Sequence, residues 1–290
     1  MTKTEVFAPA KINLALHVTG RRPDGYHLLD SLVVFAPVGD RITIGAGAGL
    51  SLTVEGPESA GVPSDMRNLA LRAAALSGQG AALVLDKRLP SSSGIGGGSA
   101  DAAATLRGMA AFHGGAVDDA QALALGADVP MCLASRPVRV RGIGERLDPV
   151  TLPPVAAVLV NPRRPVSTPA IFNALETRDN PPMPDALPDL VGAAGLIAFL
   201  KEMRNDLEAP ARRVEPVINL VLTALGAQPG CGLARMSGSG ATCFGLFARE
   251  ADAHAAARQI GRAKPDWWVA GGLLGDQSRQ AAPRLAQGAQ

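Results

Sequence analysis

The stretch from Pro90 to Ala104 combines small, flexible residues in a pattern that can bind phosphate. Glycines and serines fill Ser91–Ser99, and Ile95 is the one bulky side chain there. An apolar run, Ala82–Leu85, precedes the stretch and an alanine-rich run ends it, which predicts a strand, a glycine loop and a helix start. Glycine lets a ligand approach the backbone closely, and a helix start offers free N–H groups to an anion. We therefore predict a nucleotide triphosphate site in this loop.

A glycine-rich turn that only links a strand to a helix would have a similar composition. The spacing does separate this loop from the commonest nucleotide-binding motifs. A P-loop requires Gly-Lys followed by Ser or Thr, and the sequence contains no such tripeptide. A dinucleotide fingerprint requires a third glycine where Ser99 stands. The His-Arg-Asp and Asp-Phe-Gly motifs of protein kinases are also missing from the sequence.

Two polar residues interrupt an early apolar run, Val6–Val18, that alternates as a strand does. Lys11 and Asn13 are two residues apart, so they point to the same face of this strand, opposite Ile12. An edge strand with one polar face in water would explain the pattern. A lysine and an amide placed together in a reaction site would explain it equally well.

Two further segments carry residues that could do chemistry. Tyr26 and His27 follow a Pro-Asp-Gly turn, and together they could stack on and hydrogen-bond a planar base, or they could pack on the next strand. Asp128 lies between a predicted helix end and Pro130. It could cap the next helical turn, or it could act as a base.

Three of the segments resemble the motifs of the GHMP kinases. Pro9–Leu14 is similar to motif one, P-A-K-I/V-N-L, and Pro90–Ala100 is similar to motif two, P-x-x-x-G-L/I-G-S/G-S/G-S-A/S. The small-residue loop Ser237–Phe244 matches motif three, S/T-G-S/T-G-x-x-x-F, although a tight hairpin alone could also use Gly-Ser-Gly. Tyr26-His27, Gly126–Pro130 and Val166–Phe172 further resemble members that act on a cytidine compound.

The resemblance implies ATP-dependent phosphorylation of the 2-hydroxyl of 4-diphosphocytidyl-2-C-methyl-D-erythritol, in non-mevalonate isoprenoid (terpenoid) biosynthesis, with Mg²⁺. It implies Asp128 as the catalytic base and Lys11 as its partner. The predicted ATP-binding residues are Pro90, Ser91, Ser92, Ser93, Gly94, Ile95, Gly96, Gly97, Gly98, Ser99 and Ala100. The predicted substrate-binding residues are Asn13, Tyr26, His27, Thr168, Phe172, Gly238, Ser239 and Gly240. Ser99 is the candidate ligand for Mg²⁺, and no other metal ligand is assigned.

Two other functions stay open at this point. Another GHMP kinase, for mevalonate, homoserine or a sugar, would lack the base sandwich that Tyr26 and Phe172 are expected to form. A non-catalytic nucleotide-binding relative would have no need for both Lys11 and Asp128.

The expected fold class is α+β, the two-domain GHMP kinase fold. The resemblance implies an N-terminal domain similar to the second domain of ribosomal protein S5 and a ferredoxin-like C-terminal domain. We place an ATP-binding domain at residues 1–160 and a substrate-binding domain at residues 161–290. The tail from Gln277 is rich in Gln, Ala and Pro, and we expect it to be mobile or loosely docked.

Composition limits the partners. The 290 residues are 47% apolar and 19% charged, and the net charge of +2 is too small to indicate a nucleic-acid partner. No signal-peptide pattern or membrane-length apolar run occurs, so we expect a cytoplasmic protein. The three cysteines show no CxxC or Cys/His spacing, which supports neither a disulfide framework nor a zinc site. We expect small-molecule partners and a monomer or weak homodimer.

Overall fold

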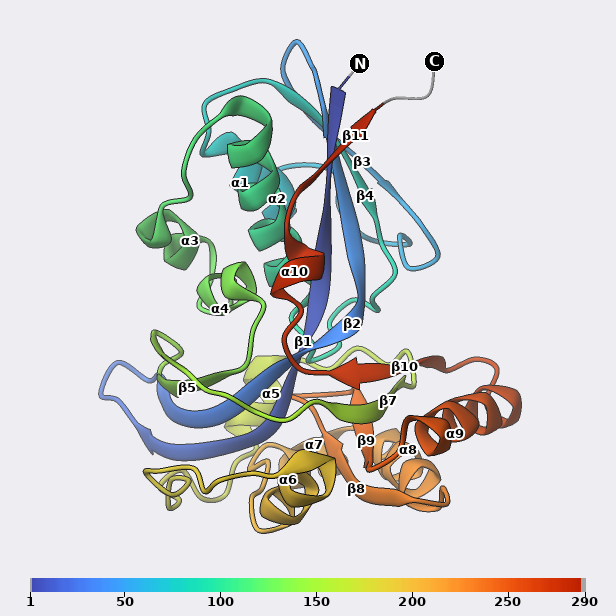
Figure 1. Ribbon diagram of the computed structural model, residues 1–290. Coiled ribbons are helices and arrows are strands. Elements are labelled where there is room, and N and C mark those ends of the chain that lie inside the picture. The colour runs from blue at the N-terminus through green and yellow to red at the C-terminus, as the bar shows by residue number, and fades with distance from the viewer. Residues whose placement is uncertain (1, 288–290) are drawn as a thin grey trace.

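The computed structural model describes residues 2–287 of the chain, and two β-sheets form its framework (Figure 1). In the first sheet the order is β11-β1-β2-β4-β3, and β5 pairs with both β2 and β6. Only β3 and β4 run parallel among the pairings of this sheet in the described residues. Its strands are β1 (Thr2–Arg21), β2 (His27–Gly45), β3 (Leu50–Glu55), β4 (Ala81–Asp86), β5 (Val138–Gly142), β6 (Arg146–Pro149) and β11 (Arg284–Gln287).

The second sheet is antiparallel and has the order β10-β7-β9-β8. Its strands are β7 (Val155–Asn161), β8 (Cys231–Met236), β9 (Cys243–Phe247) and β10 (Trp268–Leu274). Helices separate β7 from β8 and β9 from β10, so the chain follows a β-α-β-β-α-β course. The predicted ferredoxin-like architecture of this half is therefore confirmed.

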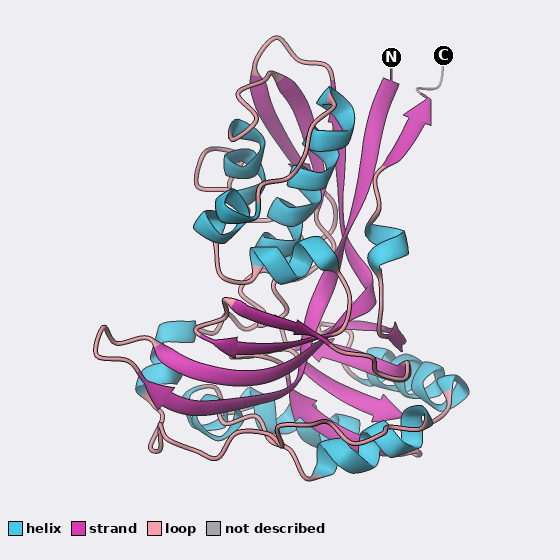
Figure 2. Ribbon diagram, turned by 60° about the vertical axis from the view of Figure 1, so that its left-hand side comes forward, coloured by secondary structure: helices cyan, strands magenta, loops and turns pink. Residues whose placement is uncertain are grey.

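The helices divide between the two sheets. Figure 2 shows several helices of the lower half below the strands of the second sheet, whereas the helix that contains Phe172 lies beside His27 of β2. Beside the first sheet lie α1 (Leu69–Ala75), α2 (Gly97–His113), α3 (Asp119–Leu125) and α4 (Val129–Ala134). The second half contains α5 (Thr168–Asn173), α6 (Gly192–Lys201), α7 (Glu208–Val214), α8 (Val217–Gly226) and α9 (Glu250–Ala263). The short helix α10 (Ser278–Ala281) precedes β11.

Small residues let α2 lie close to the first sheet. The buried face of this helix is rich in alanine, and at Gly108 an added Cβ atom would lie only 2.5 Å from Ile44 Cδ1. The core beneath it contains the large aliphatic side chains of the strands, such as Val6 and Leu85. Because Phe, Trp and Tyr make up only 3% of the sequence, this close approach of helix and sheet fills the core without large rings.

The long strands β1 and β2 belong to both halves of the molecule. Their pairing register shifts at three points, including the steps between Pro9 and Lys11 and between Asn13 and Ala15. Such bulges bend a strand and redirect its side chains. Beyond the bend, residues such as Ile12 pack into a second core together with Phe244 of β9. The bend therefore places Lys11 and Asn13 where the two halves meet.

As far as residue 287, the C-terminal segment contradicts the prediction of a mobile or loosely docked tail, and residues 288–290 lie outside the described residues. Residues 284–287 form β11, which pairs with the start of β1, so that Thr2 faces Gln287. The chain therefore returns to the first sheet after completing the second one. The proposed boundary after residue 160 falls within β7, the first strand of the second sheet, and this division into domains stays a prediction.

Candidate active site

The strand, glycine loop and helix predicted around Pro90–Ala104 are present. The loop joins β4 to α2, and Gly94 and Gly96 have φ angles of +75° and +66°, which favour glycine. A Cβ atom on Gly96 would lie 2.6 Å from Lys11 Cγ, so glycine also leaves room for the lysine. The first N–H groups of α2 have no carbonyl partner within the helix. They are therefore available to an anion in this loop.

Backbone hydrogen bonds join the three sequence motifs into one site. The N–H group of Lys11 in β1 donates to the carbonyl of Ile95 in the glycine loop at 3.0 Å. The N–H group of Thr242, within the third motif, donates to the carbonyl of Ser93 at 3.1 Å. Segments that are far apart in the sequence therefore fix the path of the glycine loop from two sides.

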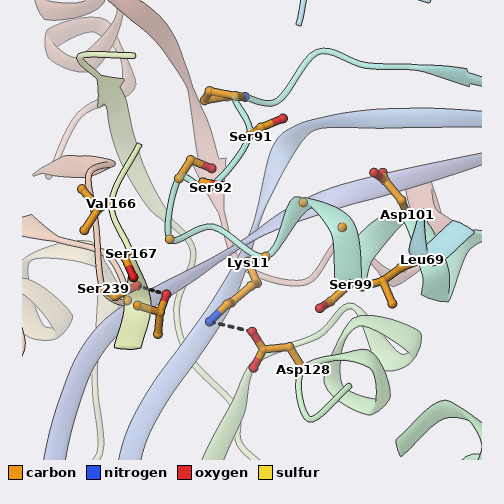
Figure 3. Close-up of a pocket in the computed structure, with 18 of the residues that line it drawn as sticks. Lys11, Leu69, Ser91, Ser92, Ser99, Asp101, Asp128, Val166, Ser167 and Ser239 are labelled. Carbon is orange, nitrogen blue, oxygen red and sulfur yellow. Dashed lines mark hydrogen bonds and ion pairs between the residues drawn. The ribbon is translucent and has the colours of Figure 1, made fainter. Parts of the chain in front are cut away.

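Lys11 and Asp128 form an ion pair at this loop (Figure 3). The distance from Lys11 Nζ to Asp128 Oδ2 is 3.1 Å, and Lys11 also donates to Asn13 Oδ1 at 2.9 Å. Asp128 is the N-cap residue of α4, but its side chain makes no capping hydrogen bond to that helix. The carboxylate is therefore turned toward the lysine. The same-face relation of Lys11 and Asn13, expected from the alternation of the strand, is confirmed.

A pocket of about 700 Å³ opens around this pair. Figure 3 shows Ser167 and Ser239 on one side of the glycine loop and Leu69 and Asp101 on the other. Of the predicted site residues in the described chain, those lining the pocket are Lys11, Pro90, Ser91, Ser92, Ser93, Gly94, Gly96, Gly97, Gly98, Ser99, Asp128, Thr168, Phe172, Gly238 and Ser239. The other predicted site residues do not line the pocket: they are Asn13, Tyr26, His27, Ile95, Ala100 and Gly240.

Two of the residues predicted to hold a base, His27 and Phe172, lie together at one end of the pocket. The rings of His27 and Phe172 are stacked, with centroids 4.7 Å apart and planes inclined by 25°. Tyr26 is 62% exposed. Burial, followed by the positive charges of Arg21 and Arg178, lowers the pKa of His27 below its usual value. His27 Nε2 is buried and has no hydrogen-bond partner among the described residues. An uncharged ring with one unused nitrogen therefore covers a face of Phe172.

A buried charge cluster beneath the glycine loop was missed by the sequence reasoning. Lys87 lies between Asp40 and Asp101, donates to Asp101 Oδ2 at 2.8 Å, and also donates to Asp40. Burial alone would lower the pKa of Lys87, but the charges of Asp101 and Asp40 outweigh it and raise that pKa to about 12. Burial raises the pKa of Asp101 to about 8, against the opposing charge of Lys87. These residues come from different elements, and no local pattern links them.

Asn205 is a second residue that lies outside the sequence motifs and contacts one of them. Its side chain lies in front of α7, where its oxygen accepts from the N–H group of Leu207 at 3.0 Å. Its Nδ2 donates to the carbonyls of Met236 and Gly238 at 2.8 and 2.9 Å. Asn205 therefore joins the start of α7 to the third motif loop.

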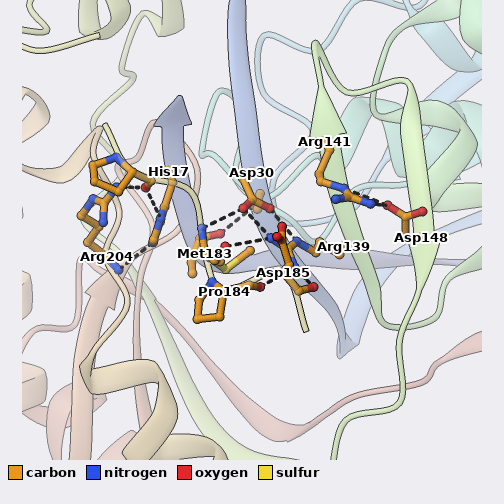
Figure 4. Close-up of polar contacts among 12 residues, drawn as sticks. His17, Asp30, Arg139, Arg141, Asp148, Met183, Pro184, Asp185 and Arg204 are labelled. Carbon is orange, nitrogen blue, oxygen red and sulfur yellow. Dashed lines mark hydrogen bonds and ion pairs between the residues drawn. The ribbon is translucent and has the colours of Figure 1, made fainter. Parts of the chain in front are cut away.

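A further polar network holds the segment after α5 against β1 and β2 (Figure 4). Arg139 forms a buried ion pair with Asp30, whose carboxylate also accepts from the N–H group of Met183 at 2.8 Å. The buried ring of His17 contacts the carbonyl of Pro181 through Nδ1 at 3.1 Å. None of these residues lines the pocket, and the network contains none of the predicted site residues.

Two of the three cysteines are buried, and the third is half-buried. Cys132, Cys231 and Cys243 are free thiols. Burial raises the pKa of Cys132 to about 12, so this thiol stays protonated near neutral pH. Within residues 2–287, no helix combines the length and apolar character that a membrane crossing requires.

Comparison with known proteins identifies relatives over nearly the whole chain. The family profile "GHMP kinases N terminal domain" matches residues 66–137, and "GHMP kinases C terminal" matches residues 190–266. A 4-diphosphocytidyl-2-C-methyl-D-erythritol kinase of Cereibacter sphaeroides is 58% identical over 270 residues, covering 92% of this chain and 97% of the relative.

Solved structures agree with this relationship. A crystal structure of 4-(cytidine 5'-diphospho)-2C-methyl-D-erythritol kinase superposes with a TM-score of 0.77 at 38% identity, covering 93% of this chain and 99% of that one. Homoserine kinase from Cytophaga hutchinsonii has a TM-score of 0.68 at 19% identity, covering 98% and 97%, which shows a shared fold. The predicted α+β fold class is confirmed, and the chain belongs to the GHMP kinase family, among its 4-diphosphocytidyl-2-C-methyl-D-erythritol kinases.

Proposed function

We propose that this chain transfers the γ-phosphoryl group of ATP to the 2-hydroxyl of 4-diphosphocytidyl-2-C-methyl-D-erythritol, a step of non-mevalonate isoprenoid biosynthesis. The observation that carries the proposal is the Lys11–Asp128 pair, 3.1 Å apart, beside a glycine loop in one pocket. Relatives more than half identical over most of the chain are named for this activity.

The proposed roles follow from what phosphoryl transfer requires. The reaction depends on positioning and on stabilising charge at the transferring group. The glycine loop and the free N–H groups of α2 would hold the triphosphate. Asp128 would accept the proton of the attacking hydroxyl. Lys11 would orient that carboxylate and neutralise negative charge on the transferring group.

The two ends of the pocket suggest where the two substrates lie. Thr168, Phe172 and Ser239 line the end toward the second sheet, and His27 stacks on Phe172 there. We assign this end to the cytidine compound, with Tyr26 as a further contact that closes over the base. The other end, with Asn68 and Leu69, is then left for the nucleoside of ATP.

The side chains of the site fit Mg²⁺ that arrives with the nucleotide. Among residues 2–287, no group of three or more His, Cys, Asp and Glu side chains is placed to hold a metal ion. Mg²⁺ commonly binds substrate phosphates with one or two protein ligands and several waters. The hydroxyl of Ser99, at the start of α2 and lining the pocket, is the proposed protein ligand. Bound Mg²⁺ would neutralise charge on the phosphate oxygens.

The deciding experiment is a coupled assay of ADP release with Mg-ATP. The acceptors are 4-diphosphocytidyl-2-C-methyl-D-erythritol, mevalonate and homoserine, each tested with the wild type and with Asp128→Asn. We expect turnover with the cytidyl compound alone and its loss in Asp128→Asn. Turnover with another acceptor would leave the family intact but reject the cytidine assignment of His27 and Phe172. Tight ATP binding without turnover would instead support a non-catalytic nucleotide-binding relative.

A selective variant tests the acceptor end of the pocket. Phe172→Leu removes the ring that His27 stacks on but keeps an apolar side chain. We expect the KM for the cytidyl substrate to rise about tenfold, since base–aromatic stacking contributes about 1–3 kcal/mol per base, while the KM for ATP stays the same.

We propose that the enzyme is cytoplasmic, because both proposed substrates are charged metabolites. We also propose that it is a monomer or a weak homodimer.

A further inference from the structure

A chain of buried hydrogen bonds runs from Lys11 into the core. Lys11 Nζ donates to Asn13 Oδ1 at 2.9 Å, and Asn13 Nδ2 donates to Ser31 Oγ at 2.8 Å. Ser31 Oγ in turn donates to the carbonyl of Ala15 at 2.7 Å. Lys11, Asn13 and Ser31 are 8%, 4% and 1% exposed, so water does not easily replace these partners. The ammonium of Lys11, beside Asp128, is therefore the outer end of a chain of hydrogen bonds that ends at the carbonyl of Ala15.

The chemistry of these groups fixes the direction of every bond in the chain. The carbonyl of Ala15 can only accept, so the single hydroxyl proton of Ser31 is used there. Toward Asn13 the hydroxyl can then act only as an acceptor, and Asn13 must present its NH₂ group to Ser31. The amide oxygen is thereby turned toward Lys11, whose ammonium can only donate. A flipped amide would place its NH₂ group against that ammonium.

Ser31 holds only the side-chain amide of Asn13, because other contacts hold the backbone of Asn13. The pairing register of β1 shifts between Asn13 and Ala15, and such a bulge interrupts the regular ladder beside the Ala15 carbonyl. On the other side, the N–H group of Asn13 donates to Ser237 Oγ at 3.1 Å. The backbone of Asn13 is thus held independently of Ser31, which holds only the amide.

We propose that Ser31 is a positioning residue for the phosphoryl transfer. By accepting from the amide of Asn13, it keeps the amide oxygen on Lys11 and so holds the ammonium in place beside Asp128. Ser31 does not line the pocket in the described chain, and it acts only through Asn13. This inference rests on the proposed function, which makes Lys11 and Asp128 the reacting pair.

The test compares three substitutions of Ser31. Ser31→Ala removes the hydroxyl, Ser31→Cys keeps its approximate size with a much weaker hydrogen-bonding group, and Ser31→Thr retains the hydroxyl. We expect kcat to fall on the order of tenfold in Ser31→Ala and Ser31→Cys, the scale of one hydrogen bond to a charged group. The KM values for both substrates should stay within about twofold, and Ser31→Thr should recover most of kcat.

The Asn13→Ala variant, which lacks the side-chain amide, separates an effect of Ser31 on that amide from a general loss of structure. In Asn13→Ala, the further change Ser31→Ala should leave kcat unaltered, because the group that Ser31 holds is gone. An equal loss of kcat in both backgrounds would overturn the proposal. So would unchanged kcat in Ser31→Ala, or equal losses in Ser31→Thr and Ser31→Ala.

A spectroscopic arm keeps the inference testable apart from the activity. The side-chain NH₂ resonances of Asn13, assigned by their disappearance in Asn13→Asp, should shift in Ser31→Ala and stay close to wild type in Ser31→Thr. If the wild type does not turn over the cytidyl substrate, the proposed function is rejected. The NMR measurement then still decides whether Ser31 orients the amide of Asn13. Unshifted amide resonances in Ser31→Ala would show that it does not, even if the enzyme is active.

Discussion

The carboxylate of Asp128 reaches Lys11 Nζ at 3.1 Å and makes no hydrogen bond to the helix that it begins. An aspartate at the N-cap position, just before the first helical residue, usually accepts a hydrogen bond from the N–H groups of that helix, and Asp128 makes no such bond. Lys11 is nearly buried, whereas the side chain of Asp128 is 36% exposed. Asn13 holds the ammonium of Lys11 on its buried side. The carboxylate of Asp128 lines the pocket, where a hydroxyl group can reach it.

If Lys11 and Asp128 act as one unit, their effects on the rate should not add. Lys11→Met and Asp128→Asn should each lower kcat by about 10²–10⁴-fold, the range for general acid–base groups. The double variant should be little worse than the more damaging single change, because each residue depends on the other. Single-turnover kinetics with the cytidyl substrate measures all three. Losses that multiply in the double variant would show that the two residues act separately.

The local parts of the site were predictable, because they rest on local chemistry. The glycine loop was expected from its composition, and Gly94 and Gly96 do take positive φ angles. Strand alternation placed Lys11 and Asn13 on one face, and the two side chains are hydrogen-bonded. The role of Asp128 was different, since a helix cap explained its local pattern and only the family resemblance favoured a contact with Lys11.

The missed parts depend on contacts between distant elements. Lys87, Asp40 and Asp101 come from different places in the chain, and no spacing rule connects them, although they form one buried cluster. The C-terminal tail was judged by its polar, proline-containing composition. That composition does not reveal that the edge of β1 is open to a further strand, which residues 284–287 supply.

The left-handed conformation of Gly96 predicts that Gly96→Ala lowers both the Tm and kcat. In Gly96→Ala the left-handed backbone alone should cost about 1–2 kcal/mol, and the new Cβ atom would lie 2.6 Å from Lys11 Cγ. We expect a lower Tm together with a loss of kcat as the lysine is displaced. Gly98→Ala is the matched control for stability, because its Cβ would meet only Leu69 Cδ1, at 3.7 Å. An equal loss of Tm in both variants would contradict the argument.

The buried cluster under the loop should respond unequally to the loss of its members. Lys87→Met leaves Asp40 and Asp101 without their cation, and removing one partner of a buried pair costs about 3–5 kcal/mol. Asp101→Asn keeps the shape and removes a carboxyl group whose ionisation burial opposes, so we expect it not to destabilise the fold at neutral pH. Urea unfolding at neutral pH measures both, with the exposed Lys201→Met as control. Equal destabilisation by Lys87→Met and Lys201→Met would be the contrary result.

The same cluster predicts a dependence of stability on pH. Burial raises the pKa of Asp101 from 3.8 to about 8, so between these values the folded protein binds more protons than the unfolded chain does. Stability from this group is therefore complete below about pH 4 and is lost as the pH rises toward 8. Asp101→Asn should remove this contribution. Unfolding free energies of the wild type and the variant should consequently diverge between pH 5 and 8, and parallel curves would disagree with the prediction.

His17 predicts a pH dependence of the opposite sign. Its Nε2 accepts from the N–H group of Arg204 at 3.2 Å, while Nδ1 contacts the carbonyl of Pro181 at 3.1 Å, so the buried ring fits its neutral form. Burial first, and then the charge of Arg204, lowers the pKa of His17 below 6.5, although Asp206 and Asp30 oppose this. The unfolded chain then binds more protons than the folded one just below pH 6.5. Stability from His17 is thus present above that pH and is lost as the pH falls through the folded-state value.

The substitution His17→Asn isolates this contribution from other groups that titrate in acid. Its amide can still donate toward Pro181, but it cannot take up a proton. Urea unfolding between pH 7.5 and 5 should show the wild type losing stability more steeply than His17→Asn, so that the difference between them narrows with acid. The exposed His254→Asn provides the control, because it makes the same change at a surface histidine outside the buried network. If His17→Asn and His254→Asn both run parallel to the wild type, the neutral ring of His17 contributes nothing to the pH response.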